Sequence, residues 1–336
     1  MKKRILSFSL ITAICLCVFA VSVIASQADF TLLMSTAKDG YYRGDTVSVD
    51  IKAAEAGVTD NLGFFSFQVT FDTDKLTLES LVAAEALGGE SYVNGTKIDW
   101  IHQDGIGTDL GAGTVIAKAT FKVKDNAAYG DTSLGFESTF TELDAVKSVS
   151  NSVQATGKTI TILKLNSVSG QVKSWNPNND VTVSLKQSGE TKYSTTVSGT
   201  KTGSGQLTQA FEISGVAAGT YDLVVSKDAH LDYTVTGITV GTNDIDLTKA
   251  TGEPYALIDM IVGDVNSSKN VNDDDLNIVW NDDNFNLSLI DAANKLTDID
   301  GDQKVNDDDL NIVWNDANFN KGISDCTYSY NGGVKE

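Results

Sequence analysis

The chain has 336 residues, of which 41% are hydrophobic and 21% charged, which is enough for two or three folded domains and argues against wholesale disorder. Its formal net charge of −20 disfavours nucleic acid and anionic membrane surfaces as partners, because both would repel it. The combination of two prolines and 29 glycines favours tight turns over stiff linkers.

The N-terminus has the pattern of an export signal, which we predict over residues 1–28. Three basic residues (2–4) precede an apolar stretch (5–24), and small residues at 25–28 offer two cleavage sites. The alternative is a retained membrane anchor, because the apolar stretch is long enough to span a bilayer. Cleavage would leave Cys326 as the single cysteine and therefore no internal disulfide. We expect a secreted protein, extracellular or associated with the cell surface, without stable membrane insertion.

Residues 29–163 are predicted to form a β-sandwich. Apolar and polar residues alternate over 47–51, 65–71 and 117–123, as expected for strands with one buried and one wet face. Glycine- and asparagine-containing turn clusters separate such runs. Residues 81–87 are the best candidate for a short helix in this region. The pattern is typical of a long β-sandwich.

Residues 166–250 repeat this pattern at a smaller scale, with five short strand-like runs separated by turns. We predict a second, small sandwich of immunoglobulin or carboxypeptidase-regulatory type. The chain has two histidines, His102 and His230, and they lie in different predicted domains, so we expect neither to be catalytic. No other set of residues indicates a catalytic centre, and we predict that the protein is not an enzyme.

The C-terminal region, residues 258–323, contains a duplication. The same twelve residues occur at 271–282 and at 305–316, and each copy completes a loop of spaced oxygen-bearing side chains. Alternate oxygens closed by a carboxylate are the ligand set that a hard cation such as calcium needs. The side chains of the first loop are Asp264, Asn266, Ser268, Asn272 and Asp275, and those of the second are Asp298, Asp300, Asp302, Asn306 and Asp309. The alternative is a solvated acidic surface without bound metal.

Apolar residues at helical spacing follow each loop, as in Leu276, Val279 and Trp280, so each loop is predicted to lead into a helix. Another short helix is predicted over 288–296, and a loose polar tail over 324–336. Because about 60 residues bury little surface, we expect calcium to fold this module. Chelation is then expected to unfold it and to leave both sandwiches intact.

These features carry a resemblance to known families. The tandem loops, each closed by Asp-Leu and followed by a helix, make residues 258–323 similar to a dockerin. The stretches 44–47, 65–72, 119–123 and 157–162 make residues 29–163 resemble a cohesin, whose fold is a jelly-roll sandwich. The sandwich between them resembles the small β-domain, or X-module, that often precedes dockerins. The whole resembles an adaptor scaffoldin of a clostridial or ruminococcal cellulosome or amylosome.

The dockerin resemblance implies two structural calcium ions and adds a backbone carbonyl ligand at position 7, which is Asn270 in the first loop and Lys304 in the second. Position 6, usually glycine, holds Lys269 and Gln303, which must adopt an unusual backbone conformation. The first loop has two carboxylates among its ligands and the second has four, so we predict tighter binding at the second.

The resemblance also implies a partner-binding face on each copy. The implied contact residues are Asp273, Asp274, Trp280, Asn281 and Phe285 in the first copy and Asp307, Asp308, Trp314, Asn315 and Phe319 in the second. Two identical faces would allow docking in two orientations. Aromatic anchors flanked by acidic residues suit a buried hot spot with a charged rim. The alternative is that both tryptophans pack inside the module.

The implied function is that of a non-catalytic adaptor. Its cohesin would bind a dockerin-bearing enzyme or subunit, and its dockerin would bind the cohesin of a larger or anchoring scaffoldin. One alternative is a carbohydrate-binding subunit anchored by its dockerin, with a stacking platform made of Tyr41, Tyr42, Tyr92 and Trp100. Another is a calcium-stiffened surface protein without a specific partner.

Overall fold

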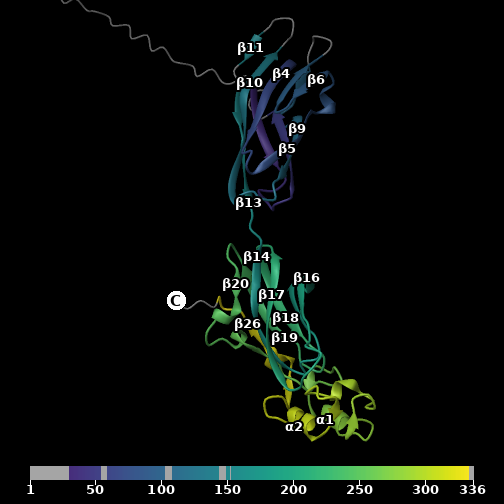
Figure 1. The fold of residues 1–336 in the computed structure, drawn as a ribbon. Coiled ribbons are helices and arrows are strands. Elements are labelled where there is room, and N and C mark those ends of the chain that lie inside the picture. Colours follow the sequence, from purple (N-terminus) through teal and green to yellow (C-terminus); the bar gives the residue numbers. More distant parts are fainter. Residues whose placement is uncertain (1–29, 54–58, 103–107, 144–148, 152, 333–336) are drawn as a thin grey trace, which may run out of the picture. The chain divides into compact units, whose positions relative to one another are not determined.

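The structure is a computed structural model that describes residues 30–53, 59–102, 108–143, 149–151 and 153–332 (Figure 1). The predicted signal peptide lies outside these residues. Two compact units divide the chain after Leu163. Among the described residues, no helix combines the length and the apolar character needed to cross a membrane.

The first unit is a sandwich of two sheets, as the period-two pattern predicts. The five-stranded sheet has the order β12 (Val153–Thr156), β1 (Phe30–Thr36), β3 (Thr46–Ala53), β9 (Val115–Val123) and β5 (Leu76–Ala83). The second sheet has the order β2 (Gly40–Tyr41), β13 (Lys158–Ile162), β10 (Gly130–Leu143), β4 (Thr59–Phe71), β7 (Lys97–Ile101) and β6 (Glu90–Asn94). At its edges, β11 (Val149–Asn151) pairs with β10, and β8 (Thr108–Leu110) pairs with β4.

The core of this unit forms where the alternating residues of the two sheets meet. Val47, Val49 and Ile51 of β3 are fully buried, as are Phe65 and Phe67 of β4. The two phenylalanine rings stack with their centroids 5.5 Å apart. Burial of such rings contributes a large share of core stability.

The predicted helix over 81–87 is wrong for most of its length. Leu81 is buried in β5, opposite Ala119 of β9, and only η1 (Glu85–Leu87) is helical, as a single 3₁₀ turn. Gly88 ends that turn with φ of +63°. Strand pairing and burial therefore outweigh the local helix propensity of the Leu-, Ala- and Glu-rich stretch.

The second unit contains a smaller sandwich. One sheet has the order β17 (Gln206–Val216), β14 (Asn166–Trp175) and β20 (Ile245–Asp246), with β21 (Ile258–Asp259) also paired to β14. The other has the order β16 (Glu190–Val197), β15 (Val181–Gln187), β18 (Gly219–Ser226), β19 (Tyr233–Val240) and β26 (Thr327–Ser329). Together with the first unit, this sandwich confirms the prediction of a mainly β protein.

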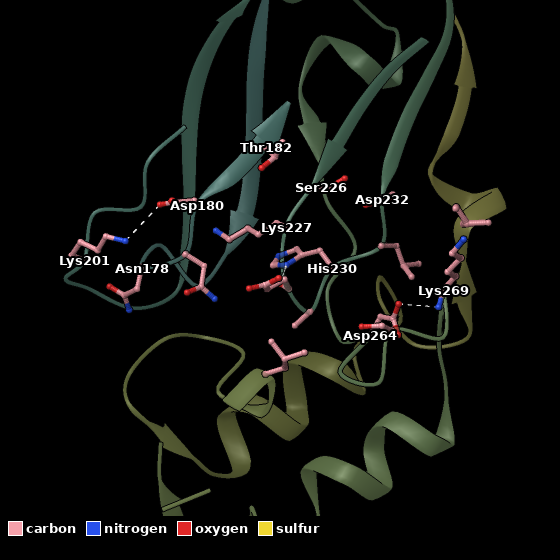
Figure 2. A pocket seen from close by; sticks show the side chains of 17 residues that line it. Asn178, Asp180, Thr182, Lys201, Ser226, Lys227, His230, Asp232, Asp264 and Lys269 are labelled. Carbon is pink, nitrogen blue, oxygen red and sulfur yellow. Dashed lines mark hydrogen bonds and ion pairs between the residues drawn. The ribbon is translucent and has the colours of Figure 1, made fainter. Parts of the chain in front are cut away.

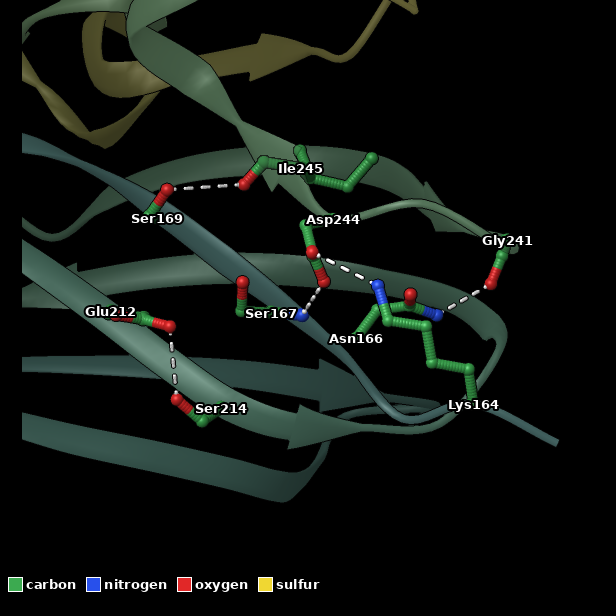
Figure 3. A network of polar contacts seen from close by, with 9 residues as sticks. All are labelled: Lys164, Asn166, Ser167, Ser169, Glu212, Ser214, Gly241, Asp244 and Ile245. Carbon is green, nitrogen blue, oxygen red and sulfur yellow. Dashed lines mark hydrogen bonds and ion pairs between the residues drawn. The ribbon is translucent and has the colours of Figure 1, made fainter. Parts of the chain in front are cut away.

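Polar contacts fix the start of the second unit against its own sheet edge (Figure 3). Asn166 Nδ2 donates to the carbonyl of Gly241 at 2.7 Å, and the Ser167 amide donates to Asp244 Oδ1 at 2.8 Å. Lys164 Nζ lies 3.1 Å from the same carboxylate. These contacts set the register at which β14 enters the sandwich.

The duplicated region forms two loop–helix copies that lie at the end of the small sandwich. In the first copy, β22 (Asn270–Val271) leads into α1 (Asp273–Val279), and in the second, β24 (Lys304–Val305) leads into α2 (Asp307–Val313). β22 pairs with β25 (Lys321–Gly322), and β24 pairs with β23 (Leu287–Ser288). The connections include the 3₁₀ turns η2 (Leu247–Lys249), η3 (Pro254–Ala256), η4 (Lys295–Thr297) and η5 (Ile323–Cys326).

The small sandwich and the duplicated region share one hydrophobic core. A single cluster of buried residues includes Val183 and Leu223 of the sandwich together with Val271 and Val313 of the two copies. The sequence predicts separate modules at 166–250 and 258–323, whereas the packing joins them in one compact unit.

Two further expectations for this unit are wrong. The stretch 288–296 is helical only in η4, and the Lys295 ammonium donates to the carbonyls of Leu289, Ile290 and Ala292 in the turn before it. The tail, predicted to be loose from Ser324 onward, forms secondary structure within residues 324–332. Its strand β26 pairs in parallel with β19, and the ring of Tyr328 stacks on that of Tyr233 at 5.0 Å.

Candidate functional site

Each oxygen-rich loop wraps around the carboxylate of its first residue. Asp264 accepts hydrogen bonds from the backbone amides of Ser268 at 2.8 Å and Lys269 at 2.9 Å. Asp298 accepts them from Gly301 at 3.0 Å and Gln303 at 3.2 Å. Both copies share the donor at loop position 6, whereas the second donor is at position 5 in the first copy and at position 4 in the second.

The predicted backbone strain at loop position 6 is confirmed. Lys269 and Gln303 have φ of +69° and +76°, in the left-handed region that favours glycine. The amide that each residue turns inward bonds the first aspartate of its loop. That hydrogen bond accounts for the tolerance of a side chain at a position where it costs conformational energy.

The end of each loop is also the start of its helix. Asn272 Oδ1 accepts the amide of Asp274 at 2.8 Å, and Asp275 accepts the amides of Asn272 and Val265, both at 3.0 Å. The second copy repeats this arrangement with its equivalent residues, and both helices carry a complete capping box. Such caps stabilise seven-residue helices that would otherwise be marginal.

Side-chain oxygens of the second loop converge. Asp298, Asp300 and Asp302 each place one carboxylate oxygen within 4.8 Å of the others. Burial raises the pKa of Asp298 to about 6, and the neighbouring charges of Asp300 and Asp302 act in the same direction. Burial likewise raises the pKa of Asp309 to about 6. The loop therefore gathers carboxyl groups whose charged forms are disfavoured by burial.

The first loop shows the same features with fewer charges. Asn266 Oδ1 accepts the Ser268 amide at 2.9 Å, and the Ser268 hydroxyl donates to the carbonyl of Asn270 at 3.1 Å. Burial raises the pKa of Asp275, and the charge of Asp264 adds to this. The carbonyl at position 7 of the second loop belongs to Lys304, whose side chain is exposed.

The donor sets fit a hard cation such as calcium. Every predicted ligand offers oxygen, and four of the aspartates are buried: Asp264, Asp275, Asp298 and Asp309. Within the described residues, no lysine, arginine or histidine forms an ion pair with these four carboxylates. Buried charges that lack a partner are costly, and a divalent cation would compensate them.

A polar pocket of about 600 Å³ lies beside the first loop, between it and the small sandwich (Figure 2). Asp264 and Lys269 reach it from the loop, and Lys227 and His230 from the sandwich. Burial lowers the pKa of Lys227 to about 8 and that of His230 to about 3. His230 Nε2 accepts the amide of Trp175 at 3.1 Å, so this ring is neutral and ties β14 to the loop that holds the histidine.

The predicted partner-binding residues lie on the outside of the two copies. Trp280 and Trp314 are 57% and 61% exposed, so the alternative that they pack the interior is wrong. Val279 and Val313 occupy the interior positions instead, because the tryptophans lie at the C-caps, where each helix ends. The remaining polar members of both sets are exposed, namely Asp273, Asp274, Asn281, Asp307, Asp308 and Asn315.

Each exposed tryptophan forms an aromatic pair with a half-buried phenylalanine. Trp280 stacks on Phe285 with ring centroids 4.6 Å apart, and Trp314 stacks on Phe319 at 5.1 Å. The stacking holds a large apolar surface in one orientation while it remains open to solvent.

The surroundings of the two faces differ. Asp308 and Asn315 of the second face line a pocket of about 770 Å³ together with Trp175 and Gln206 of the small sandwich. The equivalent residues of the first face, Asp274 and Asn281, do not line it. The sequence repeat is therefore symmetric, whereas its environment is not.

The stacking platform predicted for the carbohydrate-binding alternative does not form. Tyr41 and Trp100 are 3% and 1% exposed, and Trp100 Nε1 donates to the carbonyl of Gly88 at 2.8 Å while its ring stacks on Phe65. These two rings fill the core because they lie on the inward side of their strands. Tyr92 is exposed on β6.

Sequence reasoning assigned no binding face to the first unit, and the strand registers bring exposed side chains together on one side of its second sheet. On the outer side of β6 and β7, Tyr92 pairs with Asp99 and Glu90 pairs with Ile101. Tyr92 is 71% and Ile101 51% exposed. Hydrogen bonds from Ser66 and Lys97 lower the pKa of Asp99 even though burial alone would raise it. Only the pairing register shows that these residues share a face, so the linear sequence did not reveal it.

The comparisons concern the first unit most directly. Residues 34–162 match the family model of the cohesin domain. A comparison with curated proteins gives no match.

Several solved structures are similar to this chain. One is CaCohA2 from Clostridium acetobutylicum, at 19% identity and a TM-score of 0.31, over 39% of this chain and 90% of that one. Another is the seventh ScaB type I cohesin from Pseudobacteroides cellulosolvens, at 22% identity and a TM-score of 0.32, over 40% of this chain and 91% of that one. A chain of a type II cohesin–X–dockerin complex from Acetivibrio cellulolyticus matches at 22% identity and a TM-score of 0.36, over 48% of this chain and 99% of that one.

The family match coincides with the two-sheet sandwich of the first unit, from β1 to β13. Cohesin domains are non-catalytic modules. Residues 34–162 of this chain are a cohesin domain.

Proposed function

We propose that the chain is an exported, non-catalytic adaptor scaffoldin of a cellulosome-like or amylosome-like assembly. Its cohesin domain captures a dockerin-bearing enzyme or subunit, and residues 258–323 act as a dockerin that binds the cohesin of a larger or anchoring scaffoldin. The observation that carries this proposal is the presence, in one chain, of a cohesin domain and a duplicated loop–helix region with two outward aromatic faces.

Calcium is the proposed structural cofactor, with one ion in each loop. The first ion would be held by Asp264, Asn266, Ser268, Asn270, Asn272 and Asp275, and the second by Asp298, Asp300, Asp302, Lys304, Asn306 and Asp309. A bound divalent ion supplies the positive charge that the buried carboxylates lack. The chain contributes the wrapped loop and the capped helix, which hold the ligand oxygen atoms in place. The proposed partner-binding residues lie on the helix that follows each loop or just after it.

The outer side of β4, β7 and β6 is the proposed capture face of the cohesin. Exposed Tyr92 and Ile101 provide apolar anchors, and the ion pair of Lys97 with Asp99, 3.0 Å apart, provides a polar neighbour. Aromatic anchors inside a polar rim are typical of binding hot spots.

The capture role is tested by immobilising the mature chain and identifying the proteins it retains from the culture fluid of the producing organism. We expect dockerin-bearing proteins, and we expect a Tyr92→Ala/Ile101→Ser variant to lose them. Val82→Ala is the matched control, because Val82 is similarly exposed but lies on the opposite sheet. Retention of the chain on insoluble polysaccharide without any dockerin-bearing protein would instead favour the carbohydrate-binding alternative.

A further inference from the structure

The second calcium loop is held from outside by the small sandwich. Asn176 and Asn178 lie between β14 and β15, and their side-chain amides donate to the carbonyls of Asp298 at 2.9 Å and Gly301 at 2.8 Å. Gly205, just before β17, donates its backbone amide to the carbonyl of Asp300 at 2.7 Å. We call these three donors, Asn176, Asn178 and Gly205, the loop clamp.

The clamp hydrogen-bonds the part of the loop where the backbone turns most sharply. Its three acceptors are the carbonyls of loop positions 1, 3 and 4, all before the left-handed residue Gln303. With these carbonyls bonded outward, the amides of Gly301 and Gln303 can point inward to the Asp298 carboxylate. The sandwich therefore fixes the backbone arrangement that gathers the carboxylates of this loop.

The two sequence copies differ at the residue where the clamp makes contact. Loop position 4 is Ser267 in the first copy and Gly301 in the second, and both have positive φ, +60° and +81°. Backbone conformation alone thus does not explain the glycine. A Cβ atom on Gly301 would lie 2.6 Å from Asn176 Oδ1 and 2.8 Å from Asn178 Nδ2, so glycine is needed for the clamp to approach.

The first loop lacks such contacts. Among the described residues, no sandwich side chain donates to the carbonyls of Asp264, Asn266 or Ser267. Its nearest sandwich residues instead line the polar pocket of Figure 2, where Asp264 bonds within its own loop to Lys269.

From this asymmetry we infer that the small sandwich pre-organises the second calcium loop through the clamp, whereas the first loop has no such support from sandwich side chains. The inference rests on the proposed role of the loops as calcium sites. Asn176 and Asn178 are positioning residues: their side chains bond the loop backbone and are not among the predicted ligands. Outer-shell partners of this kind typically change metal affinity by about 10- to 100-fold.

The test compares Asn178→Ala with Asn179→Ala in the full mature chain. Asn179 lies in the same loop, and no clamp bond involves its side chain. In calorimetric titration with Ca²⁺, we expect Asn178→Ala to weaken the tighter of two sites by about tenfold and to spare the other. Asn179→Ala should match the wild type.

A metal-independent measurement separates the clamp from the calcium role. In chelator, the amides of Gly301 and Gln303 should exchange with deuterium faster in Asn178→Ala than in Asn179→Ala. Gly301→Ser, which copies the first loop into the second, should show the same acceleration, and the reverse change Ser267→Gly should not affect the second loop.

Equal exchange and equal affinity in folded Asn178→Ala and Asn179→Ala would overturn the clamp. A wild-type chain that binds no Ca²⁺ at either loop would overturn the proposed calcium role, and with it the functional meaning of the clamp.

Discussion

At the residue scale, the distribution of carboxylates distinguishes the two loops. The second loop gathers Asp298, Asp300 and Asp302 around a common point, whereas the first has asparagine and serine at the equivalents of Asp300 and Asp302. More carboxylates give a hard cation stronger attraction. The clamp acts in the same direction, so charge and pre-organisation both favour tighter binding at the second loop.

Replacement of one converging carboxylate should therefore affect one site selectively. We expect Asp302→Ala to weaken the tighter Ca²⁺ site by at least about tenfold, as measured by calorimetry. Ser268→Ala, at the equivalent position of the first loop, is the matched control and should leave the tighter site unchanged. If Asp302→Ala spares that site, the ranking of the loops is wrong.

The raised carboxyl pKa values predict an acid-sensitive site. Asp298 and Asp309 have a pKa of about 6 in the metal-free fold, above the usual value of 3.8. Protonation therefore stabilises the metal-free fold as the pH falls through 6, while it competes with Ca²⁺ for the same oxygens. Between pH 7 and pH 5, we expect the gain in melting temperature caused by Ca²⁺ to shrink. A gain that stays constant over this range would contradict the assignment of these groups as ligands.

At the element scale, the C-terminal strand ties the end of the duplicated region to the sandwich. β26 extends the sheet at β19, Tyr328 stacks on Tyr233, and Cys326 is buried beside them. The phenol of Tyr255 also hydrogen-bonds Asn331. These contacts attach the C-terminal segment, which follows the second loop, to the sandwich. The folded structures of the duplicated region and of the sandwich therefore stabilise each other.

Removal of the Tyr328 ring should loosen this closure. We expect Tyr328→Ala to lower the free energy of unfolding of the second unit by about 1–2 kcal/mol, because both ring stacking and burial are lost. Urea unfolding followed by circular dichroism measures the change. Tyr92→Ala, at an exposed position in the other unit, should leave that transition where it is.

The sequence was sufficient for elements whose pattern is local. Period-two alternation predicts the strands that contain Val47–Ile51 and Phe65–Phe71, and apolar spacing predicts a helix after each loop. The dockerin resemblance implies the unusual backbone conformation of Lys269 and Gln303. Contacts between distant segments had no local signal. The clamp joins Asn178 to Gly301 across 123 residues, and Tyr328 finds Tyr233 only through a parallel strand pairing.

At the scale of the whole molecule, the core of the second unit changes what chelation is expected to do. The sequence suggests that removing Ca²⁺ unfolds only residues 258–323. Since Val271 and Val313 belong to the same buried cluster as Val183 and Leu223, loss of the loops also removes part of the packing of the sandwich.

We therefore expect chelation to lower the melting temperature of the whole second unit, from residue 164 onward, and to leave the cohesin domain unchanged. Differential scanning calorimetry resolves the two transitions, because the cohesin domain has its own core. Loss of structure confined to residues 258–323 in hydrogen exchange, with full protection of the sandwich, would contradict this coupling.

The central claim is that one chain joins two kinds of partner through separate faces. Its most direct test is affinity capture by the mature chain in millimolar Ca²⁺, with identification of the retained proteins from culture fluid. We predict both dockerin-bearing and cohesin-bearing proteins. A Tyr92→Ala/Ile101→Ser variant should lose the first class alone, and a Trp280→Ala/Trp314→Ala variant the second class alone. Retention of the same proteins by all three chains, or of neither class by the wild type, would contradict the account.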